Sequence, residues 1–239
     1  PLVPPELKQP TLQLPWQQGL TWYLTGGPHG GWADGSAWAA IDFAPGENAG
    51  TCQPSPEYAA AAAPGLVVQA EDGRVMVNLE GKNFQGVGWT VMYMHMSATG
   101  RVAIGSRVNT GDSIGRPSCE GGYSEADHLH FARLYNGQWL AAADRKIPMV
   151  ISGWKVIGGG SQYDGSIVRG AQVIDACNCN SISVNGVPWS SAVAGAGSAG
   201  SVVENAPPGR SVETAAAASG TGGSPQKGGG GPTSASPEP

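Results

Sequence analysis

Long apolar runs and clusters of basic residues are both missing from this sequence. No stretch approaches the about 20 consecutive apolar residues that a membrane-spanning helix requires, so we expect no membrane span. Lys and Arg number 13 against 18 Asp and Glu, which gives a net charge of −5, and the basic residues nowhere gather into a patch. The electrostatic attraction that drives nucleic-acid binding therefore has no source, and we expect no nucleic-acid partner.

Charged residues are scarce, at 13% of the chain, whereas glycine and proline are abundant, at 38 and 19 residues. This composition favours many short strands joined by tight turns. With 40% hydrophobic residues, the chain can still bury a proper core. The sequence thus predicts an all-β fold built on an antiparallel sheet.

The distribution of proline and of small residues divides the chain into three parts. Residues 1–15 are rich in Pro and predict an extended lead-in along the domain surface. Residues 16–189 carry the predicted strands, including an antiparallel meander between residues 65 and 96. Over residues 190–239 Gly, Ser, Ala and Pro dominate, and such a segment buries too little apolar surface to offset the entropy of ordering it. We expect a flexible tail there.

Cysteine is also rare, with four residues in the chain, an even number. Disulfides belong to oxidising compartments, so we expect a secreted, extracellular protein. Cys52 and Cys119 lie in loops before and after the central strands, and we predict that they form one bridge. We predict that Cys177 and Cys179 close a small ring.

Histidine occurs four times in the chain, yet two of the four stand one residue apart, in Asp127-His128-Leu129-His130-Phe131. This stretch predicts a strand, and alternation places His128 and His130 on one face and Leu129 on the other. Such a pair also arises by chance, and a strand histidine is often merely packed or hydrogen bonded. Asp127 is either an oxygen partner for an imidazole or a solvated loop carboxylate.

The other two histidines stand in settings that suit metal or acid–base chemistry. His29 lies in a Gly-rich segment, residues 26–31, which predicts a flexible loop. His95 ends a predicted strand, and alternation places it on the face opposite to Met94. Asp42 lies on the polar side of a further predicted strand. A catalytic zinc takes three N or O ligands from the protein, so these side chains suffice for a metal site with further histidines beside it.

Several motifs occur together in one order along the chain. They are Leu14-Pro15-Trp16-Gln17-Gln18-Gly19, His29 with Asp42 thirteen positions later, Tyr93-Met94-His95-Met96, Cys119-Glu120-Gly121-Gly122, and His128-Leu129-His130-Phe131 followed by Leu134-Tyr135-Asn136-Gly137. Over about residues 11–165 the chain resembles the lysostaphin-type zinc metallo-endopeptidases, within them the beta-lytic, staphylolysin-like branch. It departs from them at Ala126-Asp127, where many relatives have Gly-Pro or a similar pair, and at Met94, where the branch has an aromatic residue.

The resemblance implies one zinc ion per chain, held by His29, Asp42 and His130, with His95 and His128 as the catalytic histidines beside it. The family fold is an antiparallel β-sheet core with a groove over the metal. Its members cut short peptides of bacterial cell-wall peptidoglycan, often beside glycine. We expect this chain to act on such peptides as a monomer.

Tyr163 stands in a Gly-rich segment that looks like the place where the staphylolysin-like enzymes carry a tyrosine. The resemblance implies that Tyr163 stabilises the charge that develops on the substrate carbonyl. The alternative is a loop tyrosine half-packed on the surface.

Two other functions are compatible with the same residues. One is a non-catalytic relative that binds peptidoglycan or activates another hydrolase. Such relatives usually lack a ligand, and here none is missing. The other is a β-domain with a structural metal that serves adhesion, which has no need of His95 and His128.

Overall fold

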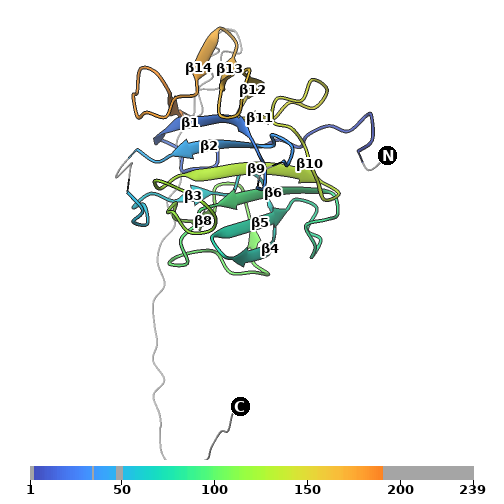
Figure 1. Cartoon of the computed structure of the whole chain (residues 1–239). Coiled ribbons are helices and arrows are strands. Elements are labelled where there is room, and N and C mark those ends of the chain that lie inside the picture. Colours follow the sequence, from blue (N-terminus) through green and yellow to red (C-terminus); the bar gives the residue numbers. More distant parts are fainter. Residues whose placement is uncertain (1–2, 34, 47–50, 191–239) are drawn as a thin grey trace, which may run out of the picture. The chain divides into compact units, whose positions relative to one another are not determined.

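The computed structural model describes residues 3–33, 35–46 and 51–190, and every regular element within these ranges is a β-strand (Figure 1). The predicted all-β fold with an antiparallel sheet core is therefore confirmed. In the same ranges there is no helix long and apolar enough to cross a membrane. The predicted tail lies outside the described residues from residue 191 on.

A single large antiparallel sheet carries the candidate site. Its strands follow the spatial order β15-β1-β2-β9-β6-β5-β4-β7, and β10 pairs with β9 at the side. Their bounds are Thr21–His29 (β1), Ala40–Ala44 (β2), Gly65–Glu71 (β4), Arg74–Asn78 (β5), Trp89–Met94 (β6), Arg107–Val108 (β7), Leu129–Tyr135 (β9), Gln138–Trp139 (β10) and Gly186–Pro188 (β15). The predicted antiparallel meander is the run β4-β5-β6.

The two faces of this sheet serve different purposes. One face packs onto the main core, in which Phe43, Tyr93 and Phe131 are fully buried. The other face, which we call the site face, carries a smaller apolar cluster that includes Met92 and Met94. Alternate residues of a strand point to opposite faces, so Asp42 and His130, which are paired in register, both lie on the site face.

The lead-in segment is part of this core. Leu12 and Leu14 are buried within it, and the N–H of Gln13 donates a hydrogen bond to the carbonyl of Ala62 at 2.8 Å. Residues of the lead-in therefore pack inside the domain, and the expectation that they lie along its surface is wrong. Burial of two leucine side chains outweighs the polar and Pro-rich character of the segment.

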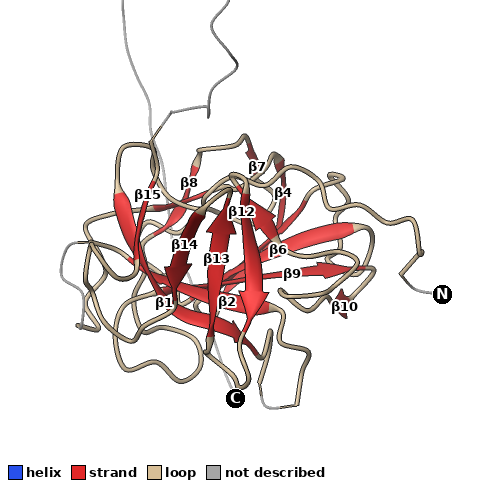
Figure 2. Ribbon diagram, turned by 90° about the horizontal axis from the view of Figure 1, so that it is seen from above, coloured by secondary structure: helices blue, strands red, loops and turns tan. Residues whose placement is uncertain are grey.

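Two smaller sheets complete the described residues. One contains β11 (Val150–Ile151), β12 (Trp154–Gly158), β13 (Gly165–Arg169) and β14 (Gln172–Asp175), and the other pairs β3 (Ala59–Ala60) with β8 (Ser113–Gly115). In Figure 2 the strands β12, β13 and β14 run across β1 and β2 of the large sheet. The turn between β12 and β13 reaches the end of β1, where His29 lies, because Tyr163 of this turn exchanges backbone hydrogen bonds with Gly27 and Pro28.

Strand β1 corrects the prediction of a flexible loop at residues 26–31. The strand continues to His29, and its register against β2 shifts twice, between Leu24 and Gly26 and again between Gly26 and His29. Each shift adds one residue to β1, which is the pattern of a β-bulge, and bulges re-aim the side chains that follow them. The glycines permit close approach at this place and do not indicate flexibility.

Gly27 illustrates this close approach. A Cβ atom at Gly27 would lie 2.5 Å from the carbonyl oxygen of Asp164, which belongs to the backbone and cannot rotate away. We therefore expect Gly27→Ala to destabilise the fold by about 1–3 kcal/mol, because the two segments must separate. The free energy of unfolding in urea measures the effect. The matched control is Gly160→Ala, where a Cβ meets nothing within 4 Å. Equal stability of the two variants would contradict the interpretation.

Both predicted disulfides are present. Cys52 and Cys119 are bridged across a sequence separation of 67 residues, and Cys177 is bridged to Cys179. The first bridge joins the segment before β3 to the loop between β8 and β9. The residues that follow Cys119 approach His95, so this bridge lies beside the candidate site.

Candidate metal and catalytic site

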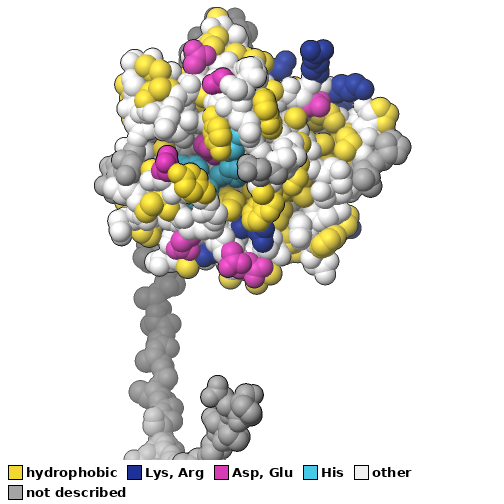
Figure 3. All heavy atoms as spheres, viewed as in Figure 1, with side chains coloured by type: hydrophobic (Ala, Val, Ile, Leu, Met, Phe, Trp, Pro, Cys, Tyr) yellow, Lys and Arg dark blue, Asp and Glu magenta, His cyan; other side chains and the backbone are white. Residues whose placement is uncertain are grey.

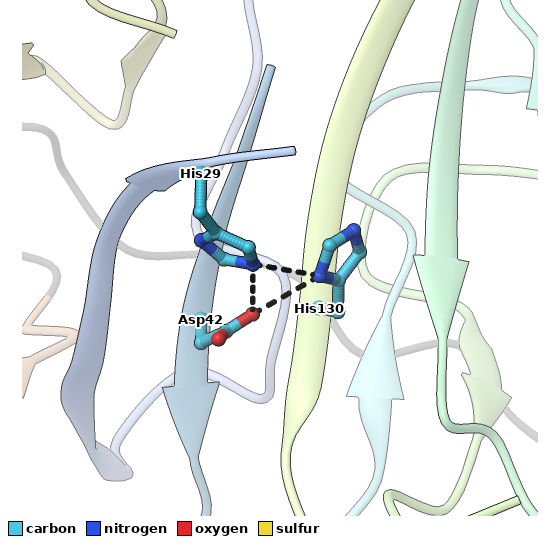
Figure 4. Close-up of side chains that lie close together, drawn as sticks. All are labelled: His29, Asp42 and His130. Carbon is cyan, nitrogen blue, oxygen red and sulfur yellow. Dashed lines mark hydrogen bonds and ion pairs between the residues drawn. The ribbon is translucent and has the colours of Figure 1, made fainter. Parts of the chain in front are cut away.

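Three neighbouring strands bring His29, Asp42 and His130 together on the site face. His29 is the last residue of β1, Asp42 lies within β2 and His130 within β9 (Figure 4). Nε2 of His29 lies 3.3 Å from Oδ1 of Asp42, and Nδ1 of His130 lies 3.3 Å from the same oxygen. The two ring nitrogens are 2.9 Å apart. These three atoms converge on one point, which is the geometry of a metal site.

The opposite nitrogens of the two rings show why a cation fits this point. Nδ1 of His29 lies 2.8 Å from the carbonyl oxygen of Gly27, and Nε2 of His130 lies 3.2 Å from that of Gly31. A carbonyl oxygen can only accept, so these nitrogens carry the ring protons. The nitrogens that face each other then present lone pairs. Two lone pairs and a carboxylate repel one another unless a cation lies between them, and N and O donors of this kind suit zinc.

Asp42 supplies the negative charge of the triad. Burial opposes ionisation of this carboxyl, but the electrostatic interaction with the nearby His29 and His128 imidazoles outweighs burial and holds the pKa of Asp42 well below its usual range. Its Oδ1 is buried, and no donor among the described residues hydrogen bonds to it in good geometry. A metal ion would satisfy a buried carboxylate oxygen of this kind.

Gly26 makes room for this carboxylate. It is paired in register with Asp42, and a Cβ atom at this position would lie 2.8 Å from Oδ2 of Asp42. Any larger residue would displace the carboxylate. The first register shift of β1 is therefore part of the construction of the site.

His95 and His128 form a second pair next to the triad, with ring centroids 4.4 Å apart. Nδ1 of His95 lies 3.1 Å from the carbonyl oxygen of Glu120, and Nδ1 of His128 lies 2.9 Å from that of Ala126. Each carbonyl fixes the ring proton on Nδ1 and leaves Nε2 with a lone pair. Burial, with the nearby His128 and His130 charges, lowers the pKa of His95 to about 3. His95 is therefore a neutral imidazole with a free lone pair on Nε2.

The backbone of His95 overturns the prediction from strand alternation. Strand β6 ends at Met94, and His95 adopts a positive φ of 66°, which turns its side chain onto the site face beside Met94 and away from the face of Tyr93. Such a conformation is strained for a histidine. Two hydrogen bonds hold it, because the N–H and the hydroxyl of Ser118 both donate to the His95 carbonyl, at 2.7 and 3.0 Å.

Tyr163 lies against the triad. Its ring stacks on that of His29, with centroids 4.2 Å apart and an interplanar angle of 19°. The N–H of Tyr163 donates to the carbonyl of Pro28 at 3.1 Å, and its own carbonyl accepts from the N–H of Gly27 at 2.7 Å. Tyr163 is 55% exposed, so it borders the space in front of His29 and remains open to it.

Asp127 is buried, at 1% exposure, so the prediction of a solvated loop carboxylate is wrong. Its N–H donates to the carbonyl of Thr51 at 2.6 Å, which places the residue between two loops. The carbonyl of Ala126 orients the His128 ring, and the hydroxyl oxygen of Ser124 lies 3.2 Å from the same Nδ1. Four main-chain carbonyls thus orient the four imidazoles, and sequence reasoning missed all of them because every residue has a carbonyl.

The site opens to the surface in a hollow. Figure 3 shows histidine atoms near the centre of the view, with hydrophobic and acidic side chains beside them and further acidic side chains at a distance. The aromatic residues Trp32, Tyr123 and Tyr163, each more than a third exposed, belong to segments that adjoin the site residues. An extended peptide chain can lie across such a hollow.

Comparison with known proteins gives one consistent result. Residues 40–142 match the sequence profile of peptidase family M23. Protease LasA of Pseudomonas aeruginosa is 28% identical over 137 residues, which are 54% of this chain and 30% of that protein. The chain thus spans less than a third of the length of the curated relatives that it matches.

Solved structures extend the comparison to the fold. The M23 metalloprotease pseudoalterin, from the deep sea, is 28% identical with a TM-score of 0.57, and the match covers 70% of this chain and 96% of pseudoalterin. The catalytic domain of lysostaphin from Staphylococcus simulans is 27% identical with a TM-score of 0.36, covering 50% of this chain and 89% of that domain.

Proposed function

Because this chain belongs to peptidase family M23, the lysostaphin-type metallopeptidases, we propose that it hydrolyses peptide bonds in the stem or cross-bridge peptides of bacterial peptidoglycan. One observation carries the proposal. His29, Asp42 and His130 converge with their donor atoms within 4.8 Å of one another, while His95 and His128 stand beside them and are not needed to hold a metal.

We propose that His29, Asp42 and His130 hold one zinc ion. When bound, zinc would supply a Lewis acid that polarises the scissile carbonyl and lowers the pKa of a water molecule towards ~7. The protein fixes the three ligands on neighbouring strands and orients both imidazoles through main-chain carbonyls. The ion would therefore enter a site whose ligands are already in place.

Proton transfer falls to the second histidine pair. Nε2 of His95 and Nε2 of His128 are the unprotonated ring nitrogens, and Nε2 of His128 lies 3.8 Å from Oδ1 of Asp42. One imidazole can accept the proton of the attacking water, and the protonated ring can deliver it to the leaving amine. Because the two rings are 4.4 Å apart, both are close enough to the same substrate bond.

Tyr163 is proposed to donate its hydroxyl to the oxygen that becomes negative when the carbonyl is attacked. We expect Tyr163→Phe to lower kcat by about 10²–10³-fold, the effect of losing one donor of this type, with zinc content and KM little changed. Steady-state kinetics on a soluble peptide, together with metal analysis, measures this. Tyr163→Leu separates the hydroxyl from the ring, since it also removes the stacking on His29. An undiminished kcat in Tyr163→Phe would show that Tyr163 contributes only packing.

The proposal also covers the cellular location of the enzyme and the bounds of its peptidase domain. Two disulfides suit an oxidising compartment, and we propose that the protein works outside the cell as a monomer. We propose residues 16–189 as the peptidase domain, preceded by the lead-in and followed by the tail.

Clearing of purified bacterial cell walls tests the function. Turbidity should fall when zinc-loaded protein is added to walls, and mass spectrometry of the released fragments should show new amino and carboxyl termini at one type of peptide bond. Walls with glycine-rich and glycine-free cross-bridges form the comparison. Zinc-loaded protein that binds walls and releases no fragments would support the non-catalytic relative in place of the enzyme.

A further inference from the structure

One row of side chains extends from the metal ligands across the site face. Register pairs Asp42 with His130, His130 with Met94, and Met94 with Arg74 of β5. Paired residues point to the same face of a sheet, so Arg74 continues the row that the triad begins. Adjacent strands lie about 4.8 Å apart, which puts the backbone of Arg74 about 10 Å from that of His130.

The guanidinium of Arg74 lies over an aromatic ring. Its Cζ is 4.4 Å from the ring centroid of Trp32, which belongs to the segment that follows His29. The indole is 41% exposed, and the nearby carbonyl of Gly31 is the one that orients His130. Trp32 therefore holds the guanidinium at the edge of the hollow.

Arg74 has no anionic partner in the described part of the chain. No carboxylate there lies within ion-pair distance of it, and its buried Nε has no hydrogen-bond acceptor. Its register neighbour Glu71 accepts a hydrogen bond from Gln69 at 3.0 Å instead. Arg101, by contrast, pairs with Glu120 at 3.2 Å. A half-buried guanidinium that lacks a counter-ion and packs on an aromatic ring suits the binding of an external carboxylate.

We propose that Arg74, held by Trp32, binds a carboxylate of the peptide substrate and makes the enzyme selective for peptides that carry one. The inference rests on the proposed function and names the substrate class more closely. An extended peptide advances about 3.3 Å per residue, so the about 10 Å between His130 and Arg74 corresponds to about three residues. The recognised carboxylate therefore lies two to four residues from the bond that is cut.

Negative charge around the hollow disfavours carboxylates elsewhere and so supports selectivity at Arg74. The protein has a net charge of −5, and Glu71 ends β4 while Asp72 lies in the turn into β5. Figure 3 shows Lys or Arg atoms at the surface below the histidines, next to hydrophobic side chains, with acidic side chains further down. A carboxylate that approaches the hollow is repelled except where a cation is presented. Arg74 therefore determines where on the substrate the carboxylate must lie, as well as the charge that the substrate must carry.

The test uses matched peptides of oligoglycine, acetylated at one end and amidated at the other. A single Glu or Gln is placed two, three or four residues from the cleaved bond, on either side, and mass spectrometry locates the cut. A second set compares a free C-terminal acid with the amide. The two sets distinguish a side-chain carboxylate from a terminal one.

For at least one placement, the wild type should cleave the carboxylate peptide with kcat/KM at least ~10-fold above its neutral partner, as expected for a charge-assisted pair. Arg74→Gln should bring this ratio to about one, and Arg74→Lys should keep part of it, since it retains the charge and loses the fork geometry. Trp32→Ala should also lower the ratio. The control is Arg107→Gln, which removes the same charge from an exposed residue of β7 and should leave the ratio unchanged.

A wild-type ratio near one at every placement, or a ratio that survives in Arg74→Gln, would overturn the inference. Failure of the proposed function looks different, since then neither peptide of a pair is cut. In that case calorimetric titration of the same peptides into the zinc-loaded protein still tests whether Arg74 binds the carboxylate. Tighter binding of the carboxylate peptide to the wild type than to Arg74→Gln supports the receptor, and equal binding refutes it.

Discussion

Replacing His29 with alanine should leave the protein without zinc and without hydrolytic activity. The imidazole is one of three donors around a single point, and its Nε2 lies 3.3 Å from Asp42 and 2.9 Å from His130. A catalytic zinc site has no ligand to spare, because its remaining position must stay open to water and substrate. Activity should fall below detection at stoichiometric zinc.

The measurement is elemental analysis of protein that has been washed with a chelator and then returned to trace zinc. Wild-type protein should recover about one zinc per chain, whereas the His29→Ala variant should recover none. Circular dichroism and thermal unfolding establish that the variant is folded, which we expect because the main core lies on the other face of the sheet. Stoichiometric zinc in the variant would show that His29 is not a ligand.

His95→Ala and His128→Ala should give a different result, in which zinc stays bound and turnover falls. Neither ring contributes to the three converging donors, and each offers an Nε2 that can take up or release a proton. General acid–base catalysis contributes ~10²–10⁴-fold, so kcat should decrease by that factor in each variant.

The double variant tests whether the two rings act together. If they serve the same proton, losing both should reduce kcat little more than the larger single loss, because residues that act as a unit are not additive. Zinc content is measured on the same preparations and compared with that of the His29→Ala variant. Loss of zinc from either single variant would mean that the replaced histidine is a zinc ligand and was wrongly assigned as a proton carrier.

Strand periodicity predicted much of the fold and of the site. Alternation placed His130 and Asp42 on polar faces, and the antiparallel register then brought them opposite one another. The signal was reliable here because these strands are regular. Leu129 and Phe131 face the main core as expected.

Prediction failed where the backbone leaves regular geometry. The segment from Gly26 to His29 contains glycine because neighbouring atoms approach it closely, and a rule that reads glycine as flexibility cannot see those neighbours. His95 leaves its strand with a positive φ that no local sequence signal predicts. The carbonyls that orient the imidazoles are likewise set by tertiary contacts, which no pattern along one chain contains.

The bridge between Cys52 and Cys119 affects the metal site and the alignment of His95 differently. The proposed zinc ligands lie on β1, β2 and β9, whereas both cysteines of the bridge lie in segments outside these strands. His95 does depend on its surroundings, because Ser118 and Glu120, on either side of Cys119, hold its carbonyl and its ring. With the proposed roles, a reduced chain would load metal and lack an aligned proton carrier. Catalytic competence would then follow oxidation, so a chain that is still in a reducing compartment would be metallated and latent.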